Sequence, residues 1–477
     1  MYSDFISFHA MRRPDAAAVL LPGGPQISYS GFEADINRVT HALAALDLPP
    51  AGRIAVATQG NPYWHWLVLL ALARLGHVSC SFAKAGDLPV IAPDAVVAFQ
   101  SGLAPASTRL LALGEEWWGR VLNSAATARV GKRTTASDPA RMLLSSGTTG
   151  TPKKVLLSHE LLVGRLKATA LGGLFPGEER SHVAMGPGTA GGFQGVLRTW
   201  WMGGAAILGA IDHQRLIRDR VTGLFLSPAQ LAALMEGVPP GADPLPIHVR
   251  VTGSAMSSRL SISARLRLAS DLLLFYGATE TAMIACCPAS KRDGDETLAG
   301  MLLPWVEAQA VGPSGEPLSP GTTGELRIRN GEMVKGYFED PEASTLAFRD
   351  GWFHPGDIGS VSETGLVRVS GRASEVINIG GQKATPDAIE HRVASCGGIK
   401  DVAAFSVARE GTAEELWLAV VAEGDIDVNG IEGACRSLGI LRANVIRTGE
   451  IPRNDMGKID RHALKELAGR AASRRLN

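Results

Sequence analysis

Short apolar segments alternate with longer helical stretches along most of the chain. Residues 53–57 and 95–99 have the length and composition of buried strands, and residues 61–75 predict a helix between them. The most apolar part of this helix, residues 66–75, is about half as long as a membrane span requires. This alternation favours an α/β fold with a large buried core.

The pattern changes near Gly321, where short alternating segments are interrupted by glycines in a way typical of a twisted antiparallel region. Beyond Arg372 the chain has its own set of predicted elements, with strands at 402–408 and 416–423 and a helix at 428–439. We therefore expect two domains, residues 1–372 and a smaller one at 373–477.

Charge and cysteine content narrow the range of partners. The 47 basic and 47 acidic residues cancel, so no global field favours nucleic acid or an anionic membrane. The five cysteines form no CxxC pair, which favours a reducing compartment. The first residues lack the basic and apolar regions of a signal peptide. We expect a cytoplasmic protein without a membrane span, as a monomer or homodimer.

A loop rich in glycine and hydroxyl residues, at 145–154, is the first phosphate-binding candidate. Its two glycines allow backbone N–H groups to turn inward, and its hydroxyls and two lysines add donors and positive charge. The order GxxxxGK[ST] is absent, so it is not a P-loop. The alternative interpretation is an ordinary polar hairpin.

A second candidate is the GxGxxG segment at 186–191. A short apolar segment precedes it, a helical stretch follows it, and Asp212 lies 21 residues beyond Gly191, as a dinucleotide-binding site requires. Pro187 argues against this interpretation, because it removes a backbone N–H where donors are needed. An NAD-dependent oxidoreductase using Gly186–Gly191 therefore remains an alternative.

Four later segments, read together with the 145–154 loop, resemble the ANL superfamily of adenylate-forming enzymes. They are Tyr276–Thr281, Gly351–Asp357, Gly371–Glu390 and Pro452–Ile459, and they occur in family order at family-like separations. This superfamily contains acyl- and aryl-CoA synthetases, peptide-synthetase adenylation domains and luciferases. The resemblance implies a large domain of stacked sheets and helices with a distorted β-barrel, and a small mobile α+β lid.

The resemblance also assigns residues to ATP. Asp357 would accept the ribose hydroxyls, Tyr276 would stack on adenine, and Glu280 would hold Mg²⁺. Lys458, Thr148 and Glu280 would be catalytic, with Lys458 bridging the carboxylate and the phosphate. The full set of implied nucleotide-binding residues is Ser145, Ser146, Gly147, Thr148, Thr149, Gly150, Lys153, Gly253, Ser254, Ala255, Tyr276, Gly277, Ala278, Thr279, Asp357 and Arg372.

The acid would bind near the GxGxxG segment, and the lid would pivot at Ser374, where the family usually has Asp or Lys. The gating His or aromatic residue expected near Thr189 is missing, and Phe193 is the nearest substitute. The acid-pocket candidates are Gly188, Gly192, Phe193, Gly277 and Met283.

Together these features predict a two-step acid–thiol ligase. A carboxylate and ATP would give an acyl-adenylate and pyrophosphate, and a thiol, coenzyme A in our interpretation, would then take the acyl group. An enzyme that loads a small acid onto an acyl or peptidyl carrier protein is the close alternative. A nucleotide-binding protein without turnover is a third.

Overall fold

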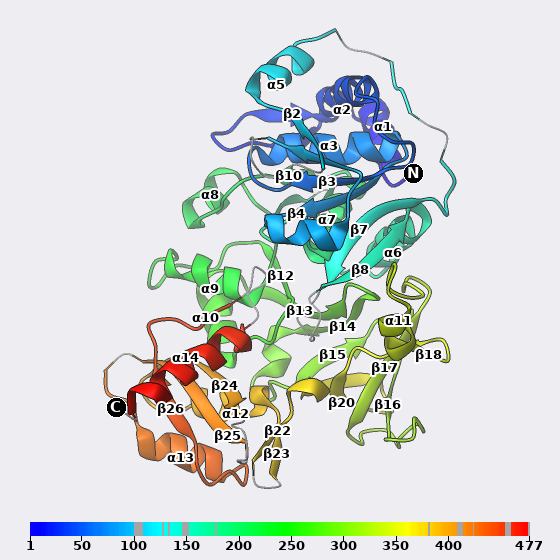
Figure 1. Cartoon of the computed structure of the whole chain (residues 1–477). Helices are drawn as coiled ribbons and strands as arrows, with labels where there is room; N and C mark the ends of the chain where they lie inside the picture. The colour runs from blue at the N-terminus through cyan, green and yellow to red at the C-terminus, as the bar shows by residue number, and fades with distance from the viewer. Residues whose placement is uncertain are drawn as a thin grey trace.

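The structure is a computed structural model, and it describes residues 1–99, 108–125, 128–131, 134–145, 152–175, 177, 179–379, 382–407, 414–422, 424–453 and 459–475. Helices and strands alternate through most of this length (Figure 1). The described α-helices are α1 (Asp4–Arg12), α2 (Tyr29–Ala44), α3 (Pro62–Arg74), α4 (Leu88–Ile91), α5 (Glu115–Leu122), α6 (His159–Leu171), α7 (Ala190–Trp201), α8 (His213–Arg218), α9 (Pro228–Glu236), α10 (Ser258–Arg267), α11 (Pro341–Ala347), α12 (Pro386–Ala394), α13 (Val428–Arg436) and α14 (Arg461–Arg475). None of the helices in the described ranges is both long and apolar enough to cross a bilayer.

The first sheet has the strand order β6-β5-β3-β4-β7-β8 and is parallel except for the pair β7–β8. Its strands are β3 (Arg53–Ala57), β4 (Val78–Phe82), β5 (Ala95–Ala98), β6 (Arg109–Ala112), β7 (Pro139–Ser145) and β8 (Lys153–Ser158). The strands predicted at 53–57 and 95–99 and the helix predicted at 61–75 are confirmed.

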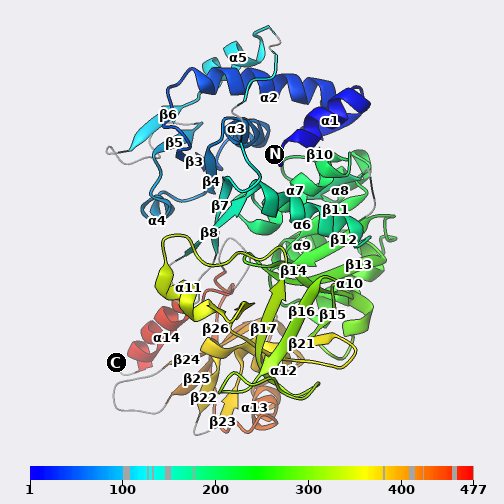
Figure 2. The same cartoon turned by 90° about the vertical axis from the view of Figure 1, so that its right-hand side faces the viewer.

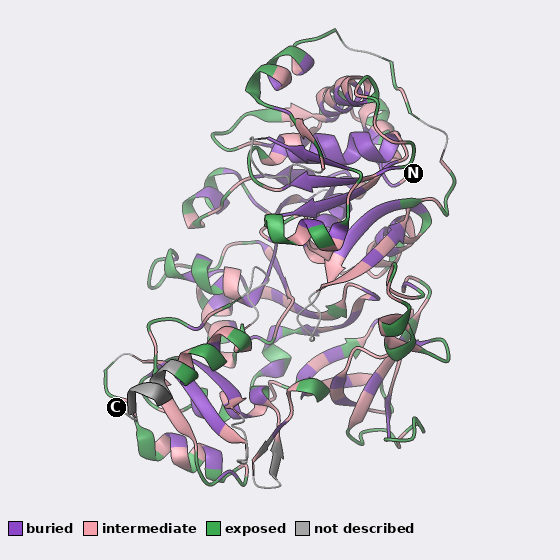
Figure 3. Ribbon diagram, in the orientation of Figure 1, coloured by how far each residue is buried: buried purple, intermediate pink, exposed green. Residues whose placement is uncertain are grey.

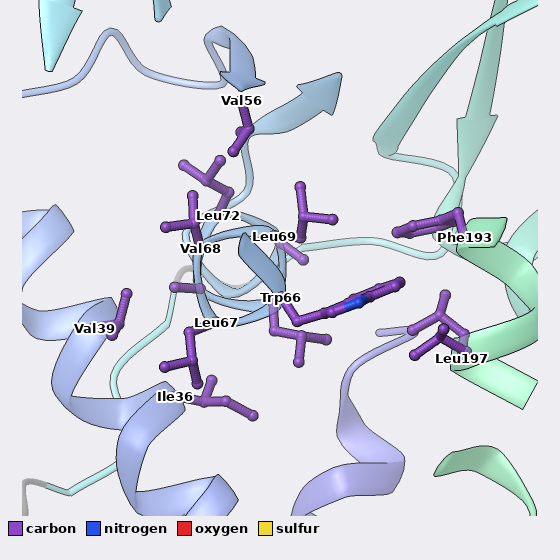
Figure 4. Packing of buried hydrophobic residues seen from close by; sticks show 14 of the residues in the cluster. Ile36, Val39, Val56, Trp66, Leu67, Val68, Leu69, Leu72, Phe193 and Leu197 are labelled. Atoms are coloured by element: carbon purple, nitrogen blue, oxygen red, sulfur yellow. The ribbon is translucent and has the colours of Figure 1, made fainter. Parts of the chain in front are cut away.

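Helix α3 forms the centre of the largest apolar core. Asn61 caps its start by accepting a hydrogen bond from the Tyr63 N–H, and Pro62 occupies the first turn. The helix is buried almost throughout (Figure 3), and Trp66 stacks on Phe193 of α7 with ring centroids 5.6 Å apart (Figure 4). This contact ties the first sheet to the second.

The second sheet joins fifteen strands of the described chain and changes character along its length. From β1 to β13 its neighbours are parallel except for the edge pair β1–β2, and from β13 onward they are antiparallel. Its strands are β1 (Ala17–Leu20), β2 (Gln26–Ser28), β9 (Arg180–Val183), β10 (Ala205–Ile207), β11 (Gly223–Leu226), β12 (His248–Thr252), β13 (Asp271–Ala278), β14 (Ala282–Pro288), β15 (Leu298–Leu302), β16 (Val306–Val311), β17 (Gly324–Asn330), β18 (Phe348–Arg349), β19 (Trp352–Phe353), β20 (Asp357–Val361) and β21 (Leu366–Arg372).

The antiparallel region predicted beyond Gly321 is therefore present, but the expected distorted barrel is not. Among the described residues these strands run in the open order β18-β19-β17-β20-β21-β15-β14, with β16 beside β17. The reason is that β15 pairs with β21, which continues the second sheet instead of closing a separate one.

Residues near the C-terminus form a sheet and a core of their own. Strands β24 (Ile399–Val407), β25 (Glu415–Ala422) and β26 (Asn444–Arg447) carry α12, α13 and α14 (Figure 2). A short antiparallel pair, β22 (Ile377–Ile379) and β23 (Gln382–Ala384), comes between β21 and β24 in the sequence. Apolar side chains from α12, β24, β25 and α13 form a core that is separate from the others.

Candidate active site

A cavity of about 2530 Å³ opens between the second sheet, the first sheet and the C-terminal part of the chain. It collects most of the described residues that the sequence assigned to ATP. These are Ser145, Lys153, Gly253, Ser254, Ala255, Tyr276, Gly277, Ala278, Thr279, Glu280, Asp357 and Arg372. Segments separated by more than 200 residues in sequence therefore meet around one space.

A polar triad closes one wall of the cavity. The Tyr276 hydroxyl donates to Oδ2 of Asp357 at 2.6 Å, and Nε of Arg372 lies 2.8 Å from Oδ1 of the same carboxylate. Asp357 and Arg372 face each other across strands β20 and β21. Burial, reinforced by the Asp357 carboxylate, raises the pKa of Tyr276, so the phenol stays protonated and acts as a donor.

The turn between β13 and β14 carries Thr279, Glu280 and Thr281. A bulge at Tyr276 and Gly277 precedes it, and a Cβ on Gly277 would come within 2.5 Å of the Ala282 carbonyl oxygen, so this position requires glycine. Glu280 is only 6% exposed and accepts a hydrogen bond of 2.9 Å from the Tyr337 hydroxyl on one carboxylate oxygen.

The glycine-rich loop is framed by β7 and β8, where Ser145 pairs with Lys153 in antiparallel register. Five of the assigned residues, Ser146, Gly147, Thr148, Thr149 and Gly150, lie outside the described residues. Lys153 lines the cavity and pairs with Asp340 at 3.0 Å, and Lys154 pairs with Glu339. Two lysines at the start of β8, just after the loop, are therefore held by the neighbouring carboxylates of Asp340 and Glu339.

Helix α7 divides its side chains between the cavity and the core. Gly191, Gln194, Gly195 and Arg198 line the cavity at helical spacing. Phe193 lies on the other face, where it is fully buried and stacks on Trp66 (Figure 4). Tyr2 meets the same ring in an edge-on arrangement. Phe193 is therefore a core residue, and the structure does not support it as a gate.

The other acid-pocket candidates divide similarly. Gly188, Gly277 and Met283 line the cavity. Gly192 packs at the start of α7, where an added Cβ would lie 2.0 Å from the Gly186 carbonyl oxygen, so it serves close packing.

The GxGxxG segment does join a strand to a helix, since β9 and β10 are parallel and α7 connects them. Two observations weaken the dinucleotide interpretation. The Asp212 carboxylate accepts a hydrogen bond of 2.7 Å from the Arg215 N–H and thereby caps α8. The segment itself faces the cavity that holds Tyr276 and Asp357.

The remaining assignments concern the lid. Ser374 is exposed in a short 3-10 turn (Ala373–Glu375) that directly follows β21. Lys458 lies outside the described residues, and Arg461 close after it contacts Glu375 and Glu390. Two further residues, Tyr337 and Arg165, contact Glu280 from distant segments, and no motif in the sequence predicted either of them as a site residue.

Comparisons with known proteins agree with this arrangement. Residues 91–338 match the family described as AMP-binding enzyme. Fatty acid–acyl-carrier-protein ligase MmaC of Mycobacterium marinum is 26% identical, covering 96% of each chain, and Indoleacetate–CoA ligase of Aromatoleum aromaticum is 26% identical, covering 98% of each.

Solved structures show the same fold. ATP-bound MatB from Rhodopseudomonas palustris aligns with a TM-score of 0.85 at 24% identity, covering 98% of this chain and 99% of that one. MenE from Bacillus subtilis with its acyl-adenylate intermediate aligns with a TM-score of 0.82 at 19% identity, covering 97% of each. The family match spans more than half of the chain, so this protein belongs to the AMP-binding enzymes, the adenylate-forming superfamily that its motifs resemble.

Proposed function

We propose that this protein is an AMP-forming acid–thiol ligase. In the first step the carboxylate attacks the α-phosphorus of ATP, which forms an acyl-adenylate and releases pyrophosphate. In the second step a thiol attacks the acyl carbon, which forms a thioester and releases AMP. The observation that carries this proposal is the convergence of Tyr276, Glu280, Asp357 and Arg372 on one cavity.

The chemistry explains why such a wall is useful. An anionic carboxylate must approach a highly charged triphosphate, so positioning and charge neutralisation supply most of the catalysis. Asp357 presents a fixed carboxylate that suits the two ribose hydroxyls, and Arg372 sits where it supports ribose or phosphate. Tyr276 borders the same space and would stack on the adenine.

Glu280 fits the role of a magnesium ligand. It is a nearly buried carboxylate beside the cavity, and among the described residues only one of its two oxygens receives a hydrogen bond. The described residues also contain no cluster of three or more His, Cys, Asp or Glu that could hold a metal alone. Mg²⁺ in nucleotide sites is characteristically held by one or two carboxylates together with the phosphates, whose charge it neutralises.

The acceptor thiol in this proposal is coenzyme A. The named relatives include a CoA ligase and an acyl-carrier-protein ligase, so a carrier protein is the alternative acceptor. The acid would lie along the cavity face of α7, near Gly188, Gly277 and Met283.

We further propose that residues 373–477 move as a lid about Ser374. Their sheet and core are separate from those of residues 1–372, and the Ala373–Glu375 turn joins the two. MatB aligns with a TM-score of 0.85 in its ATP-bound structure and 0.74 in its apo structure. This chain is closer to the ATP-bound arrangement.

The test is ATP–pyrophosphate exchange with a panel of carboxylic acids. At least one acid should stimulate exchange above the background without acid, and the same acid should then give a thioester with coenzyme A. Exchange followed by transfer only to a carrier protein would move the assignment to the carrier-loading alternative. Absence of exchange with every acid, together with micromolar binding of NAD(H), would favour the oxidoreductase.

A further inference from the structure

Arg165 is a buried cation that donates its hydrogen bonds to backbone oxygens next to Glu280. It lies on α6, is 2% exposed and borders the cavity. Its Nη1 donates to the Thr279 carbonyl at 3.1 Å and its Nη2 to the Glu280 carbonyl at 2.9 Å. Its Nε donates to the Glu332 carbonyl at 3.0 Å.

Burying a charged guanidinium costs free energy of desolvation. Burial lowers the pKa of Arg165 to about 10, with the Glu280 and Glu332 carboxylates opposing that shift. Within the described residues no carboxylate forms an ion pair with it, so the charge is balanced by carbonyl dipoles. Removing this guanidinium would leave the carbonyls of Thr279 and Glu332 without the donor shown here, so its place in the fold is set by hydrogen bonding and not by apolar packing.

The turn that Arg165 holds is fixed by residues from outside the β13–β14 ladder. Strand pairing ends at Ala278 and Ala282, which leaves the carbonyls of residues 279–281 outside the ladder. The Glu280 carbonyl also accepts from the Val334 N–H at 2.9 Å, and the Thr281 carbonyl accepts from the Asn330 side chain at 3.0 Å. Three successive carbonyls are thus fixed from outside, and Arg165 fixes two of them.

We propose that Arg165 is a positioning residue for adenylation. By holding the carbonyls of Thr279 and Glu280, its planar guanidinium sets the direction in which the two side chains extend toward the α-phosphate and Mg²⁺. The Tyr337 hydroxyl then orients the Glu280 carboxylate itself. This inference rests on the proposed function, because it concerns the same turn.

The test compares Arg165→Met with Arg165→Lys and with Arg215→Met. Arg215 is the control, because it is 6% exposed, also donates to backbone carbonyls, those of Leu208 and Ala210, and does not line the cavity, while it additionally pairs with Asp219 at 2.8 Å. For each variant we would measure the thermal midpoint, the ATP–pyrophosphate exchange rate and the Mg²⁺ concentration at half-maximal exchange.

We expect Arg165→Met to slow exchange by ~10²-fold and to raise the half-saturating Mg²⁺ concentration by ~10-fold, since the ion's ligand is no longer held in place. The KM for the acid should change less than the half-saturating Mg²⁺ concentration, because the acid is proposed to lie beside Gly277 and Met283 and not against the Glu280 carboxylate. Arg165→Lys should recover only part of the loss, because one ammonium cannot reproduce the guanidinium fork.

Arg215→Met should lower the thermal midpoint at least as much, because it also breaks the ion pair with Asp219, and should leave the Mg²⁺ midpoint unchanged. An unchanged Mg²⁺ midpoint in Arg165→Met, or the same shift in Arg215→Met, would overturn the proposal. If Arg165→Met does not fold, Arg165→Lys decides the matter by the same Mg²⁺ titration.

Failure of the proposed function is a distinct result. In that case the wild-type protein itself shows no exchange with any acid, and calorimetric titration of ATP at graded Mg²⁺ replaces the exchange assay. Weaker Mg²⁺ linkage of ATP binding in Arg165→Met than in Arg215→Met would still support the role of Arg165. Equal linkage in both would reject it.

Discussion

The Tyr276 hydroxyl and the Asp357 carboxylate, 81 residues apart in sequence, share a hydrogen bond of 2.6 Å. Tyr276 lies on β13, the strand at which the pairing of the second sheet changes from parallel to antiparallel. Asp357 is the first residue of β20, on the antiparallel side of that sheet. The hydrogen bond therefore links Tyr276, which is proposed to contact the base, with Asp357, which is proposed to contact the ribose. It fixes their separation before ATP arrives.

Asp357→Asn should weaken ATP binding by about 10- to 100-fold, because the amide keeps one neutral acceptor where the carboxylate offers two charged ones. Calorimetric titration of ATP in the absence of acid measures this directly. Tyr276→Phe is the control, since it removes the donor and keeps the ring, and its loss should be the smaller of the two. Wild-type affinity in Asp357→Asn would remove this residue from the ribose site.

Glu280→Gln should slow Mg²⁺-dependent adenylation by ~10²-fold or more, because it removes the charge that would hold the ion at the phosphates. The amide can still accept from Tyr337, so the turn should keep its shape. Exchange rates measured over a range of Mg²⁺ concentrations give the result. A variant as fast as wild type at limiting Mg²⁺ would show that Glu280 is not a ligand.

Lys458→Ala should fold normally and bind ATP, yet lose adenylation by ~10²- to 10⁴-fold, because the developing charge between carboxylate and phosphate loses its neutralising partner. Thioester formation from a chemically supplied acyl-adenylate should persist, since the proposed lid would carry this lysine away for that step. Two separate half-reaction assays on one preparation distinguish these steps. Adenylation at the wild-type rate would make Lys458 an ordinary surface residue.

Ser374→Pro should leave acyl-adenylate formation intact and suppress thioester formation, because proline restricts the turn about which the lid is proposed to rotate. Ser374→Ala is the matched control, since it removes the hydroxyl without restricting the backbone, and both half-reactions should continue. Single-turnover measurements of adenylate and thioester formation provide the readout. Equal loss of both steps in the proline variant would place the pivot elsewhere.

His65 should make the fold sensitive to acid. Its Nδ1 lies 2.9 Å from the Ala57 carbonyl and its Nε2 lies 2.9 Å from the Ser81 hydroxyl. Burial, with a contribution from Arg141, lowers its pKa to about 3. Below pH 6.5 this histidine is therefore protonated in the unfolded chain and still neutral in the folded chain. The free energy of unfolding consequently falls as the pH decreases from about 6.5 toward 3.

At pH 4.5 this amounts to about 3 kcal/mol for one histidine. Urea unfolding of wild type and His65→Asn at pH 7.5, 6.5, 5.5 and 4.5 measures it, and the wild type should lose more stability on acidification. His182 and His159 are also buried with lowered pKa values, so the variant should keep a residual slope. Parallel curves for the two proteins would refute the assignment to His65.

The parts of the fold that the sequence predicted are those with local signals. The apolar run of α3, with its Asn61 cap and Pro62, specifies a buried helix from neighbouring residues alone. The open end of the second sheet was not predictable in this way, because β15 pairs with β21 more than 60 residues later. The resemblance supplied a barrel that the observed pairing does not form.

The site shows the same division. Tyr276, Glu280 and Asp357 were found because their segments carry recognisable motifs, whereas Arg165 acts through carbonyls that leave no trace in sequence. Phe193 was misplaced although a signal existed. It recurs with Val196, Leu197 and Trp200 at helical spacing, which marks the core face of α7 and not the cavity face.

The insertion of β21 between β15 and β20 has a consequence for how the protein is made. The wall that holds Asp357 and Arg372 can assemble only after a long loop has closed on strands that were synthesised much earlier, and such non-local closure is slow. A nascent chain that ends before residue 372 lacks this wall. The proposed nucleoside contacts can therefore form only after residue 372 has been synthesised, so a shorter nascent chain has a core but not this wall.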